Sequence, residues 1–240
     1  MDKRGGARSE AKLALLVVDM QNDFLSRGSP LLVPSGQAAL SQAARAVAAA
    51  RANDVMVIYT RSSFRSDGLD LGLSGTHYGE IGQGSRLVEG SLGAEIHADI
   101  APLQGDVVIT KHRYSAFYGS DLDIVLQGAG VSSVAIAGVT TENCCHATAR
   151  DAMFRGYEVI VLSDATAAYP YRDRSHLWLD ADEVQEVTLA VLAGSTASVI
   201  TAKEFTELAR LRAPARVDDR DHELPAARAP AGQRPCIEVR

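Results

Sequence analysis

The chain has 240 residues, of which 46% are hydrophobic and 22% charged, a composition typical of a globular domain. Its 24 basic and 30 acidic residues give a formal net charge of −6, so it lacks the basic excess that nucleic acid binding requires. No apolar run reaches the roughly 18 residues of a membrane span, and the first residues do not resemble a secretory signal. We therefore expect a cytoplasmic protein with neither a nucleic acid nor a membrane partner.

The sequence predicts one folded domain, residues 12–212, between two tails. Residues 1–11 are polar and predict a flexible N-terminal tail. Residues 213–240 contain four of the eight prolines, five arginines and five acidic residues without an apolar period, which predicts a disordered C-terminal tail. The three cysteines, Cys144, Cys145 and Cys236, are too few and too unevenly spaced for a disulfide framework, and we interpret them as free thiols.

Between the tails, short apolar runs alternate with stretches of helical period. Leu13 to Val18 is almost continuously apolar, as expected of a strand buried on both faces. A helix at Gln37–Asn53 and a strand at Val55–Thr60 follow, and then residues 61–93, rich in Gly and Ser, predict a long functional loop with short helical pieces. The later elements are, in order, a strand at Asp106–Thr110, a helix at Leu122–Gln127, a strand at Val131–Val139, a helix at Cys144–Arg155, a strand at Glu158–Ser163, a helix at Asp180–Ala193, a strand at Ser198–Thr201 and a helix from Glu204.

This alternation predicts an α/β fold in which helices cover both faces of a mostly parallel, six-stranded sheet. In such sheets, ligands bind beyond the carboxyl ends of the strands, where the strand order reverses. Asp19 follows the first predicted strand, Lys111 follows the third, and Cys144 comes shortly after the fourth. We therefore expect these three side chains at the same edge of the sheet.

An acid, a cation and a thiol at one sheet edge predict a covalent catalytic site. A helix N-terminus and the charge of Lys111 would stabilise the Cys144 thiolate, and Asp19 would serve as base and then as acid. Each residue alone also has an ordinary structural interpretation: Asp19 as a turn residue, Lys111 in a surface ion pair and Cys144 as a small core side chain. The pattern alone leaves both interpretations open.

Three motifs resemble those of the isochorismatase-like cysteine hydrolases, in the same order and at suitable spacing. They are VVDMQNDF (Val17–Phe24), TKHRYSAF (Thr110–Phe117) and GVTTENCCHATARDA (Gly138–Ala152). The resemblance covers about residues 12–205. It implies a three-layer α/β/α Rossmann-like fold and a catalytic triad of Asp19, Lys111 and Cys144.

The resemblance also implies details of the turn before the cysteine. It places a cis peptide bond between Val139 and Thr140, and an oxyanion hole in the backbone amides of Thr140 and Cys144. Cys145 occupies a position that is usually apolar, so we interpret it as a core residue. Because family members commonly assemble, we expect a homodimer or a homotetramer.

The cysteine and the segment after the second strand narrow the implied chemistry. True isochorismatases lack the cysteine, whereas nicotinamidases add a metal site on a histidine-rich segment after the second strand. Here that segment, residues 61–80, contains only His77, and a lone histidine makes no metal site. We therefore expect neither a metal nor another cofactor. The KHRYSAF segment is most similar to the ureidoacrylate, biuret and N-carbamoylsarcosine amidohydrolase branch.

Other residues near the motifs are candidates for binding a small-molecule substrate. Asn22, Phe24 and Tyr114 belong to the motifs, and Arg61 follows the second strand, where it could hold a carboxylate. Arg65 is more simply explained as a solvated loop charge. Tyr169 and Tyr171 form either a pocket lid or a subunit contact. The conformations of loops 61–93 and 165–178 do not follow from the sequence.

Three functional hypotheses remain. The first is a metal-independent cysteine amidohydrolase that cleaves a C–N bond of a small ureido, carbamoyl or amide compound through a Cys-linked acyl intermediate. The second keeps the triad but acts on a larger or cyclic amide, such as a lactam of an antibiotic. The third is a catalytically silent scaffold, which the complete triad argues against.

Overall fold

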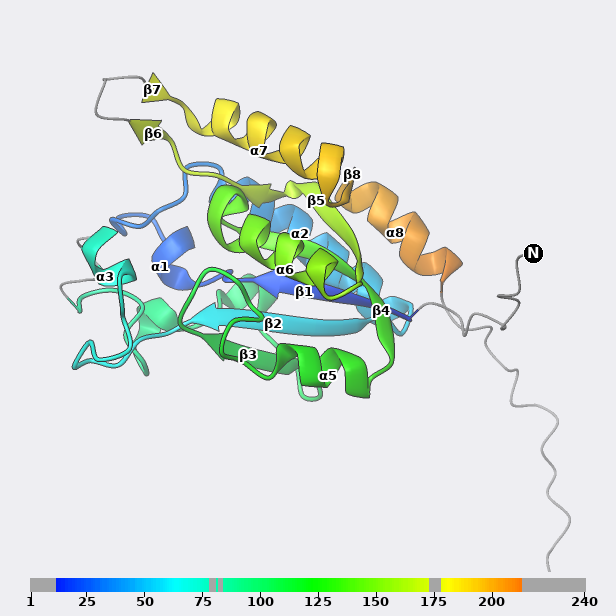
Figure 1. The fold of residues 1–240 in the computed structure, drawn as a ribbon, viewed down its shortest axis with the longest axis horizontal. Coiled ribbons are helices and arrows are strands. Elements are labelled where there is room, and N and C mark those ends of the chain that lie inside the picture. Colours follow the sequence, from blue (N-terminus) through cyan, green and yellow to red (C-terminus); the bar gives the residue numbers. More distant parts are fainter. Residues whose placement is uncertain (1–11, 78–80, 82–83, 173–177, 213–240) are drawn as a thin grey trace, which may run out of the picture.

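The computed structural model describes residues 12–77, 81, 84–172 and 178–212 (Figure 1). The two predicted tails, residues 1–11 and 213–240 with Cys236, lie outside this part of the chain. Some residues of loops 61–93 and 165–178 also lie outside it.

A six-stranded sheet forms the centre of the fold, and all of its strand pairs are parallel. In spatial order the strands are β3 (Val107–Lys111), β2 (Met56–Ser62), β1 (Lys12–Val18), β4 (Val131–Val139), β5 (Glu158–Ala167) and β8 (Ser198–Ile200). The order reverses between β1 and β4, so the carboxyl ends of these two strands flank the place where a ligand is expected in such a sheet. This confirms the predicted fold class.

Helices bury both faces of the sheet, which explains the continuously apolar strands (Figure 1). Alternate residues of β1 pack to opposite sides: Leu15 and Val17 join one core, whereas Leu16 and Val18 join the other. The first core contains α2 (Gly36–Ala52) and α8 (Ala202–Leu211). The second contains α5 (Leu122–Gly128), α6 (His146–Phe154) and one side of α7 (Ala181–Ser195).

Short elements line the carboxyl edge of the sheet. They are α1 (Asn22–Leu25), α3 (Ser74–His77), the 3-10 turns η1 (Leu92–Ala94) and η2 (Ala98–Ile100), and the π-helical turn η3 (Thr141–Cys145). The helical pieces expected in residues 61–93 are thus present as α3 and η1. The sequence did not predict α1.

The structure corrects several predicted boundaries. β5 continues past Ser163 to Ala167, and a short antiparallel ribbon of β6 (Tyr171–Arg172) and β7 (Trp178–Leu179) follows it. Capping boxes at Asp180 and Thr201 start α7 and α8, so α8 begins before the predicted Glu204. α7 runs through Gly194 to Ser195, because a glycine in the last turn need not end a helix.

Among the described residues, no helix is long and apolar enough to cross a membrane.

Candidate active site

Asp19 follows β1 directly and is completely buried. Its φ angle of 51° is uncommon for a residue other than glycine and turns the carboxylate back toward β2. One carboxylate oxygen, Oδ1, accepts a hydrogen bond from Thr60 Oγ1 at 2.6 Å. The other, Oδ2, accepts one from Ser62 Oγ at 3.0 Å. β2 therefore holds the carboxylate in one orientation.

Lys111 is the last residue of β3 and is also completely buried. Its Nζ lies 2.7 Å from Asp19 Oδ2 in an ion pair and donates to Ser62 Oγ at 2.9 Å and to the carbonyl oxygen of Arg113 at 3.0 Å. The same Nζ lies 3.4 Å from Cys144 Sγ. One ammonium group thus joins the acid to the thiol.

Cys144 lies in η3, in the turn between β4 and α6. The peptide bond between Val139 and Thr140 is cis, where the resemblance placed it. Both Cys144 and Cys145 are free and buried, and Cys145 packs in the core with no solvent exposure, as expected. The helical turn begins at Thr141, three residues before the predicted start, and the amide of Cys145 donates to the carbonyl oxygen of Thr140.

Lys111 favours the thiolate form of Cys144, as expected, but burial of the thiol opposes it more strongly. Burial raises the pKa of the Cys144 thiol to about 12; Lys111 lowers it, but not enough to compensate, and Asp19 raises it further. Burial is the largest single effect on Lys111 and disfavours its charged form, yet Asp19 and Cys144 together outweigh burial and raise the Lys111 pKa. The resting site therefore holds an ammonium group beside a protonated thiol.

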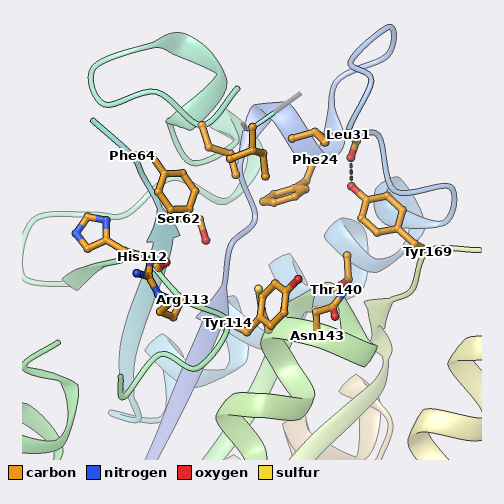
Figure 2. A pocket seen from close by; sticks show the side chains of 13 residues that line it. Phe24, Leu31, Ser62, Phe64, His112, Arg113, Tyr114, Thr140, Asn143 and Tyr169 are labelled. Atoms are coloured by element: carbon orange, nitrogen blue, oxygen red, sulfur yellow. Dashed lines mark hydrogen bonds between the residues drawn. The ribbon is translucent and has the colours of Figure 1, made fainter. Parts of the chain in front are cut away.

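A cavity of about 530 Å³, including the space open to solvent at its mouth, lies over Cys144 (Figure 2). Apolar and aromatic side chains form much of its lining: Phe24, Leu31, Phe64, Ile81, Leu87 and Tyr169. The lining also contains Cys144 and the smaller polar residues Ser62, Thr140 and Asn143. His112, Arg113 and Tyr114 form a third side.

Of the four predicted substrate-binding residues, two line this cavity and two do not. Phe24 and Tyr114 are in its lining. Asn22 instead donates from Nδ2 to the carbonyl oxygen of Leu92, 2.8 Å away. Arg61 donates to Thr110 Oγ1 and lies 3.6 Å from Glu95.

Arg61 does not reach the cavity because β2 continues to Ser62 instead of ending, as predicted, at Thr60. Because side chains alternate along a strand, Thr60 and Ser62 face Asp19, whereas Arg61 faces the other way. Arg65, expected as a solvated charge, is exposed and pairs with Asp67.

Several residues of the site were not singled out from the sequence. Ser62 contacts both Asp19 and Lys111, and the side chain of Gln21 in turn bonds the backbone N–H and C=O of Ser62. The QND sequence after Asp19 was the available signal for Gln21.

Tyr169, one of two tyrosines expected to form either a pocket lid or a subunit contact, lines the cavity, and its hydroxyl donates to the carbonyl oxygen of Leu31.

Among the residues that the structure describes, no group of three or more His, Cys, Asp and Glu side chains is arranged to hold a metal ion.

Comparison of the sequence with known proteins identifies a family and individual relatives. Residues 13–204 match the isochorismatase domain. The chain is 33% identical over 170 residues to the ureidoacrylate amidohydrolase RutB of Azorhizobium caulinodans, covering 64% of this chain and 75% of that protein. It is 36% identical over 157 residues to a probable inactive nicotinamidase of Arabidopsis thaliana, covering 65% of this chain and 80% of that protein.

Solved structures show the same fold. A cysteine hydrolase from Pseudomonas syringae pv. phaseolicola superimposes with a TM-score of 0.80 and 35% identity, over 84% of this chain and 93% of that one. The N-carbamoylsarcosine amidase of Thermoplasma acidophilum superimposes with a TM-score of 0.63 and 29% identity, over 80% of this chain and 96% of that one.

Proposed function

The chain belongs to the isochorismatase family, and from that premise we propose that it is a metal-independent cysteine amidohydrolase. It hydrolyses a C–N bond of a small ureido, carbamoyl or amide compound. The observation that carries the proposal is the buried chain of contacts from Asp19 through Lys111 to Cys144, at the floor of a cavity. Relatives named for the hydrolysis of ureidoacrylate and of N-carbamoylsarcosine support the choice of bond.

The first half of the reaction acylates Cys144. Because the thiol is protonated at rest, its proton passes to Asp19 as Sγ attacks the substrate carbonyl carbon. Lys111 stays charged and stabilises the negative charge that develops on sulfur. The amides of Thr140 and Cys144 bind the carbonyl oxygen of the tetrahedral intermediate. Asp19 then gives its proton to the departing nitrogen, and the C–N bond breaks.

The second half releases the acyl group. Water enters where the amine left and gives a proton to Asp19 as its oxygen attacks the thioester carbon. The C–S bond breaks, and the proton returns from Asp19 to Cys144. Asp19 is thus base and acid in turn, so its carboxylate must keep its position, which the hydrogen bonds from Thr60 and Ser62 secure.

Ammonia release in the presence of a chelator tests the proposal. The panel contains biuret, a ureidoacrylate analogue, an N-carbamoyl amino acid, maleamate, nicotinamide and a lactam, so that it includes larger and cyclic amides. We expect turnover of at least one open-chain amide or ureide, and a loss of about 1000-fold or more in Cys144→Ala. Cys145→Ala is the matched control, because that thiol packs in the core.

Two results would contradict the proposal. Substantial activity in Cys144→Ala would exclude the cysteine mechanism. Activity that disappears with chelator in the unaltered enzyme would exclude metal independence. Complete silence, combined with a Cys144 that no alkylating agent modifies, would favour a scaffold protein.

A further inference from the structure

The cavity has two chemically different sides, which is unexpected for a site that binds a small polar ureide. In Figure 2, Phe24, Leu31 and Phe64 lie across the pocket from Thr140 and Asn143. Leu87 completes the apolar side and is 1% exposed. A substrate whose reacting carbonyl lies at Cys144 therefore extends toward a surface that offers carbon atoms and few hydrogen-bonding groups.

This apolar surface is held in place by polar contacts behind it. The backbone N–H of Leu87 donates to Asp23 Oδ2 at 2.7 Å, and Asp23 is itself buried. Phe64 exchanges backbone hydrogen bonds with Leu87 and Glu89. The surface is therefore ordered before substrate arrives, and an apolar group that covers it gains free energy without a large ordering cost.

The other end of the site restricts the leaving group. The Asp19 carboxylate has no solvent exposure and already accepts hydrogen bonds from Thr60, Ser62 and Lys111. A nitrogen that takes a proton from Asp19 must fit beside these groups and Cys144. An unsubstituted amino group fits this space better than a substituted amine, so the variable part of the substrate lies on the acyl side.

We propose that the substrate is a terminal carboxamide, R–CO–NH2, or a terminal ureide, R–NH–CO–NH2, whose group R is apolar where it meets Phe24, Leu31, Phe64 and Leu87. This inference rests on the amidohydrolase function proposed above. The thiol and the substrate form an acyl thioester and release ammonia. Water then cleaves the thioester to the acid and the free thiol; a ureide gives a carbamic acid, which loses carbon dioxide.

Arg113 is the residue that argues for a different substrate. It is the one residue of permanent charge among the described residues of the lining. Its Nη1 donates to the carbonyl oxygens of Asp70 and His112, which orients the guanidinium. It follows His112, whose ring lies 6.1 Å from the Phe64 ring at the edge of the apolar surface (Figure 2). A substrate carboxylate bound by Arg113 is therefore the alternative that the experiment has to separate.

Matched pairs of substrates, tested with the unaltered enzyme, distinguish an apolar group R from a carboxylate bound by Arg113. Acetamide, butanamide and hexanamide extend the apolar chain, while succinamic acid and adipamic acid, the monoamides of succinic and adipic acid, carry a carboxylate at the end of chains of matched length. We expect kcat/KM for ammonia release to rise by about fourfold for each methylene group that is buried. The kcat/KM of hexanamide should exceed that of adipamic acid by at least tenfold. Phenylurea and N-carbamoylglycine form the corresponding ureide pair.

A variant of the apolar surface gives a second, independent readout. Leu31→Ser should lower the ratio of kcat/KM for hexanamide to that for acetamide by at least fivefold. Leu211→Ser is the matched control, because Leu211 is 78% exposed near the end of α8, and it should leave that ratio unchanged. The ratio is insensitive to a loss of folded enzyme, and the substrate series remains decisive if Leu31→Ser does not fold.

The outcomes distinguish this inference from the function on which it rests. Cys144-dependent hydrolysis that favours the carboxylate substrates would overturn the apolar specificity and assign substrate recognition to Arg113, while the amidohydrolase function stands. Equal rates for acetamide and hexanamide would also overturn it. Absence of turnover for every amide, with no covalent modification of Cys144, would overturn both.

Discussion

Lys111 connects the Asp19 carboxylate to the Cys144 thiol, and its energetics follow from complete burial. A buried ammonium group is costly unless it is paired and hydrogen-bonded, and here Asp19, Ser62 and the carbonyl oxygen of Arg113 surround it. Burial raises the pKa of the Cys144 thiol, and Asp19 offsets part of the opposing effect of Lys111, so the neutral thiol is the favoured resting form. In the proposed mechanism, the thiol therefore loses its proton to Asp19 as it attacks the substrate and not before.

The protonated thiol predicts how alkylation depends on pH. The folded-state pKa of Cys144, about 12, lies above the ordinary thiol value of 9.0, so the thiolate fraction rises throughout the range from pH 7 to pH 10. We expect the rate of alkylation at Cys144 by iodoacetamide to rise about tenfold per pH unit in that range. Peptide mass spectrometry after timed quenching measures this rate. A plateau below pH 8 would show a preformed thiolate.

A double-mutant cycle tests the ion pair. Lys111→Met leaves the Asp19 carboxylate buried without its cation and should lower the free energy of unfolding by about 3–5 kcal/mol. Asp19→Asn in the Lys111→Met background removes the unpaired charge, so the double variant should be more stable than Lys111→Met alone. Urea denaturation measures all four proteins. Additive losses would mean that the two charges do not interact in the folded protein.

The turn after β4 shows how an element positions the reactive groups. Gly138 pairs with Val18 of β1 one residue before the cis peptide bond. Its φ angle is 135°, and a Cβ atom there would lie 2.0 Å from the carbonyl oxygen of Val18. Only glycine allows β1 and β4 to approach this closely where Asp19 and η3 follow them.

This close approach predicts a large effect of a single methyl group. Gly138→Ala should lower the free energy of unfolding by about 3 kcal/mol or more and abolish turnover, since the backbone must shift. Gly194→Ala is the matched control: a Cβ at Gly194 in α7 meets no atom within 4 Å, and the change should stabilise the protein by about 0.5–1 kcal/mol. Thermal denaturation compares the two. A Gly138→Ala enzyme of normal stability would disprove the packing argument.

The strands and their reactive ends were predictable from the sequence, whereas the pocket was only partly so. Strands buried on both faces appear as continuous apolar runs, and parallel pairing then brings Asp19 and Lys111 to one edge. Leu31, Phe64 and Leu87 lie in connections without a period, so no pattern marks them as neighbours. β2 extends two residues beyond its predicted end, which turns Arg61 away from Asp19 and brings to it Ser62, for which no role was predicted.

In the whole molecule, the two faces of the sheet carry the apolar cores, whereas its carboxyl edge carries the candidate active site. Two apolar cores on either side of the sheet stabilise the fold, and the residues that meet at Cys144 come from the carboxyl ends of β2, β3 and β4 and from the connections beyond β1 and β5. The ends of the strands therefore position the buried carboxylate, ammonium group and thiol, while the connections supply most of the apolar lining of the cavity. Substitutions in the connections should change specificity more readily than chemistry.

The central claim is that Cys144 carries the acyl group during turnover. Acid quenching during steady-state turnover of a hydrolysed amide, followed by peptide mass spectrometry, tests it directly. We predict a mass increase equal to the acyl group on the peptide that contains Cys144, located on that sulfur and not on Cys145, and absent in Cys144→Ala. Turnover without any acylated Cys144, under conditions in which a model thioester survives the quench, would contradict the mechanism.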